Sequence, residues 1–154
     1  MSITLEQRIQ HLEDQAAIKR VVDTFSNLAD VKDIASQMYL FTEDATVNTY
    51  FGDTLFASMK GREEIGKVFS SFIASFETMY HMNGQCTIEI DGDHATSTHY
   101  CLVFLVGEAN GKKFNNSNGV IYQDEYVRRD GTWLIASRTA RFTWRDVGEL
   151  VAPN

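Results

Sequence analysis

His81 lies where the sequence changes from a helical pattern to a strand pattern. Apolar residues recur at helical spacing up to Phe76, and the period becomes two from Thr78 onward. A side chain at such a junction faces any cavity that lies between a helical layer and a sheet. Imidazole is the side chain best suited to take up and release a proton near neutral pH, so His81 is a candidate general base. The alternative is a half-exposed histidine at the start of a strand.

The other three histidines have different settings. His99 alternates with Ser97 and Cys101 in a strand pattern, so it faces either the pocket, where it could bind a substrate, or the helix layer as a buried histidine. His11 lies on a polar helix face and His94 in a hairpin turn, where we expect exposure to solvent. The four histidines lack the spacing of a tetrahedral zinc site. We predict no bound metal and no cofactor.

Asn118 belongs to a polar run, Asn115–Gly119, inside a long strand pattern. Gly119 indicates a bulge or a close approach of another group to the backbone. If Asn118 faces a pocket mouth, its amide could bind a substrate oxygen; a role on an edge strand or a dimer surface is the alternative. Arg138 and Arg141 could pair with the acidic helices, and Arg141 could also approach an anionic ligand.

Nucleophilic catalysis and phosphate binding lack their usual sequence signals. The chain has no Gly-x-Ser-x-Gly motif and no glycine-rich phosphate loop. Cys86 and Cys101 have no basic neighbour in the sequence that would activate a thiolate, and we predict free buried thiols. These observations favour acid–base chemistry over covalent catalysis.

The composition is typical of a small globular protein with a pocket. A chain of 154 residues with 44% hydrophobic residues suits a single domain, 1–154, and aromatic residues at 12% fit a pocket lined with rings. The net charge of −7 argues against nucleic acid as a partner. No apolar run has membrane-spanning length, and the first residues do not form a signal peptide. We therefore expect a cytoplasmic protein with no membrane partner.

The first half of the chain predicts helices and a short hairpin. Thr4 and Gln7 form a capping box, and the helix that follows ends at Ala29–Asp30, with an allowed break near Glu13–Asp14. The next predicted elements are a short helix over 31–41, a turn at 42–44, strands over 45–51 and 55–59, and a helix whose apolar stripe runs from 65 to 76.

The second half predicts four long strands joined by tight turns. Their ranges are 78–90, 94–106, 114–128 and 132–144. Helices followed by a meander of long strands predict an α+β fold with the helices on one face. Strands of this length must twist, and the helices can fill only part of the concave side. The expected result is an apolar pocket between the helices and a curved, mainly antiparallel sheet.

Several segments in this order resemble the SnoaL-like branch of the NTF2-like superfamily. The resemblance covers nearly the whole chain and implies a cone-shaped α+β fold with a deep pocket, a homodimer and no metal. The segments that carry it are the capped helix ending at Ala29–Asp30, Leu40–Ala45, Gly61–Ile65, the hairpin Ile90–Ala95 and the ending Tyr122–Arg138.

Two residues further resemble the scytalone dehydratase and bile-acid dehydratase group. Asp30 follows the long helix and His81 begins the strand after the third helix, as the catalytic pair does in that group. The resemblance implies an Asp–His dyad at the pocket bottom, and Tyr50 is the nearest match to a tyrosine that hydrogen-bonds the substrate. An ungapped count places Leu105 where scytalone dehydratase has a second catalytic histidine, and Ala29 where the family has a tyrosine.

Two kinds of function follow from these residues. The first is a cofactor-independent lyase or isomerase that dehydrates or isomerises a small hydrophobic carbonyl or hydroxy compound, with His81 as base and acid and Asp30 as its partner. A carboxylate bound to one imidazole nitrogen fixes the tautomer and makes the other nitrogen a better base. The second is a domain of the same fold that binds a hydrophobic ligand or associates as a dimer without catalysis.

Overall fold

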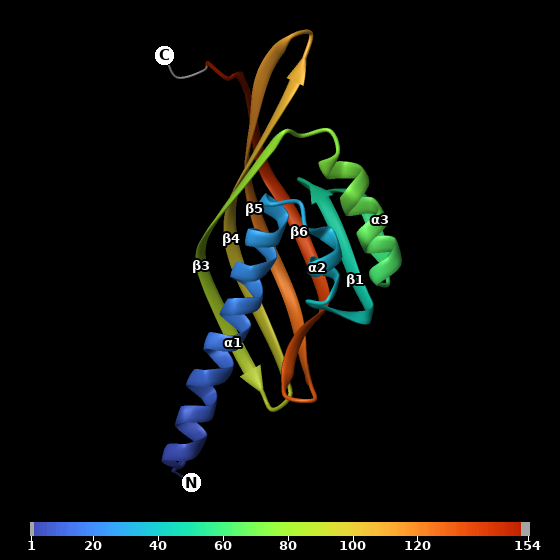
Figure 1. Ribbon diagram of the computed structural model, residues 1–154. Coiled ribbons are helices and arrows are strands. Elements are labelled where there is room, and N and C mark those ends of the chain that lie inside the picture. Colours follow the sequence, from blue (N-terminus) through green and yellow to red (C-terminus); the bar gives the residue numbers. More distant parts are fainter. Residues whose placement is uncertain (1, 152–154) are drawn as a thin grey trace.

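The structure, a computed structural model, describes residues 2–151, which form one twisted six-stranded sheet with helices on one of its faces (Figure 1). The strand order is β2-β1-β6-β5-β4-β3, and every neighbouring pair is antiparallel except the parallel pair β1 and β6. The predicted α+β class with a mainly antiparallel sheet is confirmed. The elements are α1 (Leu5–Asp30), α2 (Ile34–Met38), β1 (Phe41–Phe51), β2 (Thr54–Lys60), α3 (Arg62–Ile73), β3 (Thr78–Asp91), β4 (His94–Ala109), β5 (Lys112–Arg129) and β6 (Thr132–Glu149).

Helix α1 begins at the predicted capping box. The Thr4 hydroxyl accepts a hydrogen bond from the backbone N–H of Gln7 at 3.1 Å, and the Gln7 side chain accepts one from the Thr4 N–H at 2.9 Å. The helix then runs past the end of the sheet in its first half (Figure 1) and along the sheet in its second half. Within residues 2–151, no helix is both long enough and apolar enough to cross a membrane.

The predicted break in this helix near Glu13–Asp14 is wrong, because Asp14 does not cap a second helix. Its carboxylate is buried against the sheet and accepts hydrogen bonds from the Trp133 indole at 3.0 Å and from Arg128 at 2.6 Å. These contacts from β5 and β6 hold the middle of an uninterrupted helix. Asp14 therefore binds the sheet from the middle of α1 and does not start a second helix.

Strand β1 begins four residues earlier than predicted, so the predicted turn at 42–44 is wrong. Phe41 is fully buried and pairs with Ile135 of β6, whose N–H donates to the carbonyl of Leu40 at 2.8 Å. This parallel pairing joins segments far apart in the sequence, and it outweighs the local turn preference of Thr42, Glu43 and Asp44. The short helix α2 correspondingly occupies only the middle of its predicted range.

Strands β3 to β6 follow the predicted order, and β4, β5 and β6 run further than predicted at one end of the sheet. The predicted irregularity at Gly119 is confirmed, since the pairing of β5 with β6 shifts between Gly119 and Val120. The Trp144 indole lies directly over this glycine, and a Cβ at position 119 would be only 2.0 Å from the indole nitrogen. Only glycine leaves room for the ring there.

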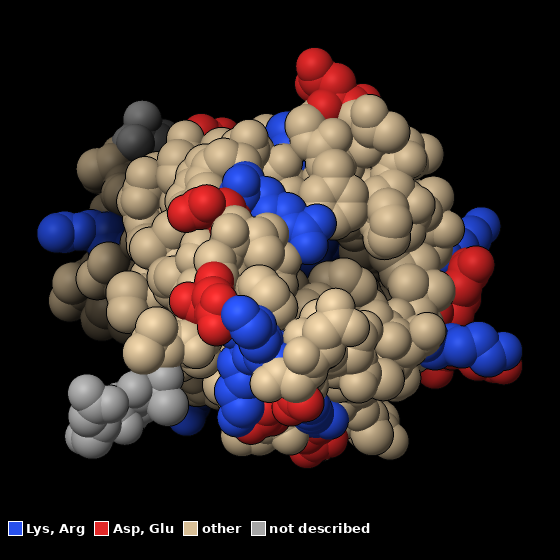
Figure 2. Space-filling view, turned by 90° about the horizontal axis from the view of Figure 1, so that it is seen from above, with Lys and Arg blue, Asp and Glu red and all other residues tan. Residues whose placement is uncertain are grey.

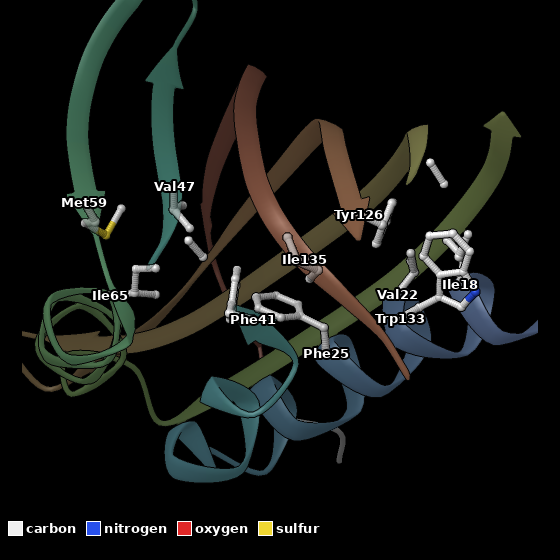
Figure 3. Close-up of a cluster of buried hydrophobic side chains, with 12 residues drawn as sticks. Ile18, Val22, Phe25, Phe41, Val47, Met59, Ile65, Tyr126, Trp133 and Ile135 are labelled. Atoms are coloured by element: carbon white, nitrogen blue, oxygen red, sulfur yellow. The ribbon is translucent and has the colours of Figure 1, made fainter. Parts of the chain in front are cut away.

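The core fills the space between the helices and the sheet, as Figure 3 shows for one cluster. Phe25 of α1 lies in its centre and makes edge-on contacts with Phe41 at 6.0 Å and Phe69 at 6.1 Å between ring centres. A second cluster joins the three helices to β3, β4, β5 and β6, and residues of both clusters line a cavity. The first cluster consists of Ile18, Val22, Phe25, Phe41, Ala45, Val47, Met59, Ile65, Ala95, Tyr126, Trp133 and Ile135.

Candidate functional site

An apolar cavity of about 120 Å³ lies between the helices and the sheet. Its inner wall includes Ala29, Leu105 and Tyr122, whereas four phenylalanines line it nearer the ends of β1 and α3. That end is uppermost in Figure 1, and Figure 2, which looks onto it, shows a hollow near its middle, bordered by uncharged residues and, on one side, by Lys or Arg atoms. The four phenylalanines are Phe51, Phe56, Phe72 and Phe142. This volume and the apolar lining suit a hydrophobic molecule of about the size of one ring.

Asp30 and His81 meet at the wall of this cavity. Asp30 is the last residue of α1, and His81 is the fourth residue of β3, which packs beside α1. The carboxylate contacts His81 twice: one oxygen lies 2.6 Å from the ring Nδ1, and the other accepts a hydrogen bond from the backbone N–H at 3.1 Å. The His81 side chain is 6% exposed and the Asp30 side chain 26%. The structure thus brings together the two residues predicted as a dyad.

This contact determines which nitrogen of His81 is free. A carboxylate accepts hydrogen bonds, so the ring donates to Asp30 through Nδ1–H. The other ring nitrogen, Nε2, then carries the lone pair in the neutral imidazole. His81 belongs to the cavity lining and Asp30 does not. The arrangement therefore gives the cavity a base whose tautomer is set from behind by a carboxylate.

Further contacts between α1 and β3 support the position of the pair. Asn83, two residues beyond His81 on the same strand face, donates to Asp23 at 3.1 Å and to the Ser26 hydroxyl at 3.0 Å. Asp23, Ser26 and Asp30 are spaced three and four residues apart on α1, which places them on one side of the helix. The strand that carries His81 is thereby held to the helix that carries Asp30 through more than one side chain.

The cavity wall next to this pair, on the neighbouring strand β4, is apolar at Leu105, where the family resemblance would place a second histidine. Leu105 of β4 pairs with Met79, and both residues line the cavity. Val103, which pairs with His81, lines it as well. Proton transfer at this wall would therefore depend on His81.

Arg138 is a cavity residue whose role sequence reasoning missed. Its guanidinium is 1% exposed and makes a two-pronged contact with Asp124, through Nε at 2.9 Å and one terminal nitrogen at 2.7 Å. The other terminal nitrogen, Nη1, has no hydrogen-bond partner among the described residues. Arg138 thus pairs with β5, and its expected pairing with the acidic helices is not formed. Arg138 also belongs to the cavity lining, although Nη1 itself is fully buried.

The electrostatic setting of Arg138 keeps it charged. Burial alone would lower the pKa of Arg138, but the charge of Asp124 and its hydrogen bonds raise that pKa overall. The guanidinium also lies 4.1 Å from the centre of the Phe25 ring and 4.7 Å from that of Tyr122, which suits a cation. Arg138 is therefore a fixed positive charge beside an apolar space.

His99 lies behind the cavity wall rather than in it. It is 2% exposed, is not part of the cavity lining, and stacks on Tyr122 with 4.8 Å between ring centres. Its Nδ1 is 4.0 Å from Asp124, too far for a hydrogen bond. Burial and the nearby charge of Arg138 lower the pKa of His99 from 6.5 to about 4. His99 is therefore neutral near physiological pH.

We expect this buried histidine to make the protein less stable in acid. The pKa of His99 is about 4 in the folded chain and 6.5 when unperturbed, so the unfolded chain binds the extra proton first. The free energy of unfolding should fall by up to about 1.4 kcal/mol per pH unit between these values. Urea unfolding at a series of pH values measures this slope. His99→Phe should reduce the slope and His94→Phe, at an exposed site, should not; equal slopes in all three proteins would contradict the prediction.

Tyr50 and Asn118, the other predicted substrate contacts, lie outside the cavity lining. Thr49 and Phe51 line the cavity, so the intervening Tyr50 points to the other face of β1, where its ring lies 4.6 Å from the Arg141 guanidinium. Asn118 is buried in the sheet and donates to the carbonyl of Val103 at 3.2 Å. Neither side chain reaches the space beside His81.

Arg141 does not form the expected pair with the acidic helices. Its guanidinium donates to the carbonyl of Gly52 at 2.6 Å and lies 3.5 Å from Asp53 in the turn between β1 and β2. As for metals, no group of three or more His, Cys, Asp or Glu side chains within residues 2–151 could hold an ion.

Solved structures with this fold are numerous, and three illustrate the range. The chain superposes on a candidate scytalone dehydratase from Novosphingobium aromaticivorans with a TM-score of 0.73 and 21% identity, covering 93% of this chain and 91% of that one. An NTF2-like protein from the same organism superposes with a TM-score of 0.74 and 23% identity, covering 90% of this chain and 87% of that one. A hexachlorocyclohexane dehydrochlorinase, LinA-type3 from Novosphingobium barchaimii, superposes with a TM-score of 0.80 and 16% identity, covering 95% of this chain and 99% of that one. The predicted NTF2-like fold is confirmed.

Sequence comparison finds a family and uncharacterised relatives. An uncharacterised protein from Mycobacterium tuberculosis is 25% identical over 133 residues, which are 84% of this chain and 86% of that protein. The family model described as a SnoaL-like domain matches residues 10–139, a stretch that contains Asp30, His81 and Arg138. Together with the fold, this match identifies the chain as a member of the SnoaL-like domain family.

Proposed function

We propose that this protein is a cofactor-independent lyase or isomerase that acts on a small hydrophobic carbonyl or hydroxy compound. The observation that carries the proposal is the 2.6 Å contact between Asp30 and His81 Nδ1, with His81 on the wall of an apolar cavity. This contact leaves His81 Nε2 as a base in a site that excludes most water. General acid–base catalysis of this kind contributes about 10²- to 10⁴-fold to rate.

The proposed reaction is the loss of water from a β-hydroxy carbonyl compound. His81 Nε2 takes the proton from the carbon next to the carbonyl, and the electron pair of that C–H bond forms an enolate. As the enolate collapses, the C–C double bond forms, the C–O bond to the hydroxyl group breaks, and the protonated His81 returns its proton to the leaving oxygen. Water leaves, and the base is restored. In an isomerisation the proton would instead return to another carbon.

Arg138 supports this proposal as the group that would stabilise the enolate oxygen. Arg138 lines the cavity, its Nη1 donor has no partner among the described residues, and its charge is held in place by Asp124. A fixed donor aimed at developing negative charge lowers the barrier because no reorganisation is needed during the reaction. Because Leu105 on the neighbouring strand β4 cannot transfer a proton, His81 serves as both base and acid on one face of the substrate.

The relatives with solved structures give the proposal further support. Two kinds of protein that share the fold bear names that denote eliminations, a candidate scytalone dehydratase and a hexachlorocyclohexane dehydrochlorinase. Loss of water and loss of hydrogen chloride both begin with proton removal from carbon. A base on an apolar cavity wall is the common requirement, and His81 meets it here.

Ligand binding without turnover is the second candidate function. Leu105 favours it, because this side chain lines the cavity where an ungapped count places the second catalytic histidine of scytalone dehydratase, and leucine cannot transfer a proton. A cavity of this kind would still hold a hydrophobic molecule. In this case His81 would serve as a hydrogen-bonding group for the ligand rather than as a base.

The predicted homodimer stays a proposal, and the outer face of the sheet supports it. Several large apolar side chains on β3, β4 and β6 are exposed there and border a shallow groove. Packing against a second copy would cover them. These side chains are Met82, Tyr100, Leu102 and Trp144.

A panel of cyclic β-hydroxy ketones in deuterated water tests the proposed enzyme. The expected result is an enone absorbance that grows faster than in buffer, with deuterium entering next to the carbonyl on the same time scale. Isomerisation would give deuterium uptake without an enone. If panel members bind but show neither product nor deuterium uptake, the lyase and isomerase proposals fail and the binding function remains.

A further inference from the structure

Gln37 carries a buried polar atom that no contact in the fold explains. Gln37 lies in α2, is only 1% exposed, and forms part of the cavity lining. Its side-chain nitrogen donates to the backbone carbonyl of Phe25 at 2.9 Å. Its oxygen, Oε1, is fully buried and has no hydrogen-bond partner among the described residues.

The contact with Phe25 determines which way the amide points. A backbone carbonyl only accepts hydrogen bonds, so the NH₂ group must face Phe25 and the oxygen must point elsewhere. The start of α2 is fixed by Asp33, which accepts hydrogen bonds from the Ser36 backbone at 3.0 Å and the Ser36 hydroxyl at 2.7 Å. Gln37 is therefore held on a rigid element with its acceptor side free.

Gln37 and Arg138 both contact Phe25, which also lines the cavity. Gln37 binds the backbone carbonyl of Phe25, and the Arg138 guanidinium lies over the ring of Phe25. Gln37 has a buried acceptor and Arg138 a buried donor without a partner among the described residues, and both residues line the same apolar space. Buried polar groups in native proteins almost always have partners. A ligand that supplies both partners would satisfy both atoms.

We propose that Gln37 is a specificity-determining residue whose Oε1 accepts a hydrogen bond from a hydroxyl group of the ligand. The favoured ligand class is then a hydrophobic molecule with a hydroxyl donor placed toward Gln37 and an oxygen acceptor placed toward Arg138. This inference rests on the proposed function only in that a small molecule enters the cavity. It holds whether or not His81 transfers a proton to or from that molecule.

Three probes of almost the same shape separate a hydroxyl donor from other contacts. In 4-propylphenol the polar group both donates and accepts a hydrogen bond, in 4-propylanisole it only accepts, and in 4-propyltoluene it does neither. Ligand-observed NMR or calorimetry gives the dissociation constant of each probe. We expect the phenol to bind about fivefold more tightly than the anisole, the size of effect that one neutral hydrogen bond produces.

The variants Gln37→Met and Gln123→Met complete the test. Gln37→Met keeps a long flexible side chain but removes the acceptor, so the preference for the phenol over the anisole should disappear. Gln123 is exposed on β5, so Gln123→Met should keep the preference. The ratio of two affinities in one protein is unaffected by a loss of folded material. His81→Ala should also keep the preference, which separates this inference from the proposed chemistry.

Three results would overturn the inference. The first is equal binding of the phenol and the anisole to the native protein. The second is an unchanged preference in Gln37→Met. The third is that no probe binds at all. By contrast, a preference that survives in His81→Ala without any turnover of hydroxy ketones would leave Gln37 in its assigned role and remove only the proposed catalysis.

Discussion

Asp30→Asn should lower kcat/KM by about 10²- to 10⁴-fold, the range that general acid–base catalysis contributes, while the protein remains folded. The carboxylate accepts hydrogen bonds from both Nδ1 and the backbone N–H of His81, and an amide has only one oxygen to offer. If that oxygen keeps the backbone contact, the amide NH₂ faces Nδ1. His81 then carries its proton on Nε2, and the nitrogen that faces the substrate can no longer act as a base.

A matched variant on the same helix controls for the lost charge. Glu13→Gln also removes a carboxylate from α1, but Glu13 is exposed and does not line the cavity. We expect its kcat/KM to be close to that of the native protein. Steady-state kinetics on the best member of the hydroxy-ketone panel measures both variants. Equal activity of Asp30→Asn and Glu13→Gln would show that Asp30 does not orient the base.

Asp124→Ala should lower the free energy of unfolding by about 3–5 kcal/mol, the usual cost of removing one partner of a buried ion pair. Asp124 binds Arg138 through two hydrogen bonds and also accepts one from the Tyr126 hydroxyl at 2.9 Å. The substitution leaves the Arg138 guanidinium buried without its counter-charge and leaves the Tyr126 hydroxyl with only Ser97 as a hydrogen-bond partner. Both groups lose a partner that water cannot easily replace.

Asp93→Ala provides the comparison for an exposed ion pair. The Asp93 side chain is 71% exposed and accepts a hydrogen bond from Arg128 at 2.9 Å. Its removal should cost less than about 1 kcal/mol, as is usual at a surface. Urea unfolding followed by circular dichroism gives both values. A cost at Asp124 no larger than that at Asp93 would contradict the account of Arg138 as a charge fixed by burial.

Much of the fold follows from local sequence patterns. The change from helical spacing to alternation near Thr78 places the helices before the long strands, and the turn residues at Asp91–Asp93 and Asp130–Gly131 fix two hairpins. The start of β1 could not be found in this way. Phe41 joins the sheet by pairing with a strand that follows some ninety residues later, and no local pattern records that pairing.

The candidate site divides in the same way. His81 was found at the change of period, and Asp30 through the family resemblance. Arg138 and Asp124 face each other in the hairpin of β5 and β6. Counting residues outward from the turn misses this pair by one residue, because the register shifts between Glu125 and Tyr126. Such a bulge, which reverses the side that each residue faces, is not visible in the sequence.

Gln37 and Tyr50 show two further limits of sequence reasoning. A glutamine in a short helix gives no sign that it is buried, because burial there depends on the packing of α2 between α1 and α3. Tyr50 was selected by resemblance, whereas the alternation of Thr49 and Phe51 turns it away from the cavity. Both assignments needed the three-dimensional positions of several elements.

Deuterium uptake next to the carbonyl of a hydroxy-ketone substrate, followed by NMR, is the most direct test of His81 as the base. The comparison requires the native protein, His81→Ala and His94→Ala, since His94 is an exposed histidine far from the cavity lining. We predict equal uptake rates for the native protein and His94→Ala, and a rate at the level of buffer for His81→Ala with its folded structure intact. An uptake rate in His81→Ala equal to that of the native protein would contradict the central claim.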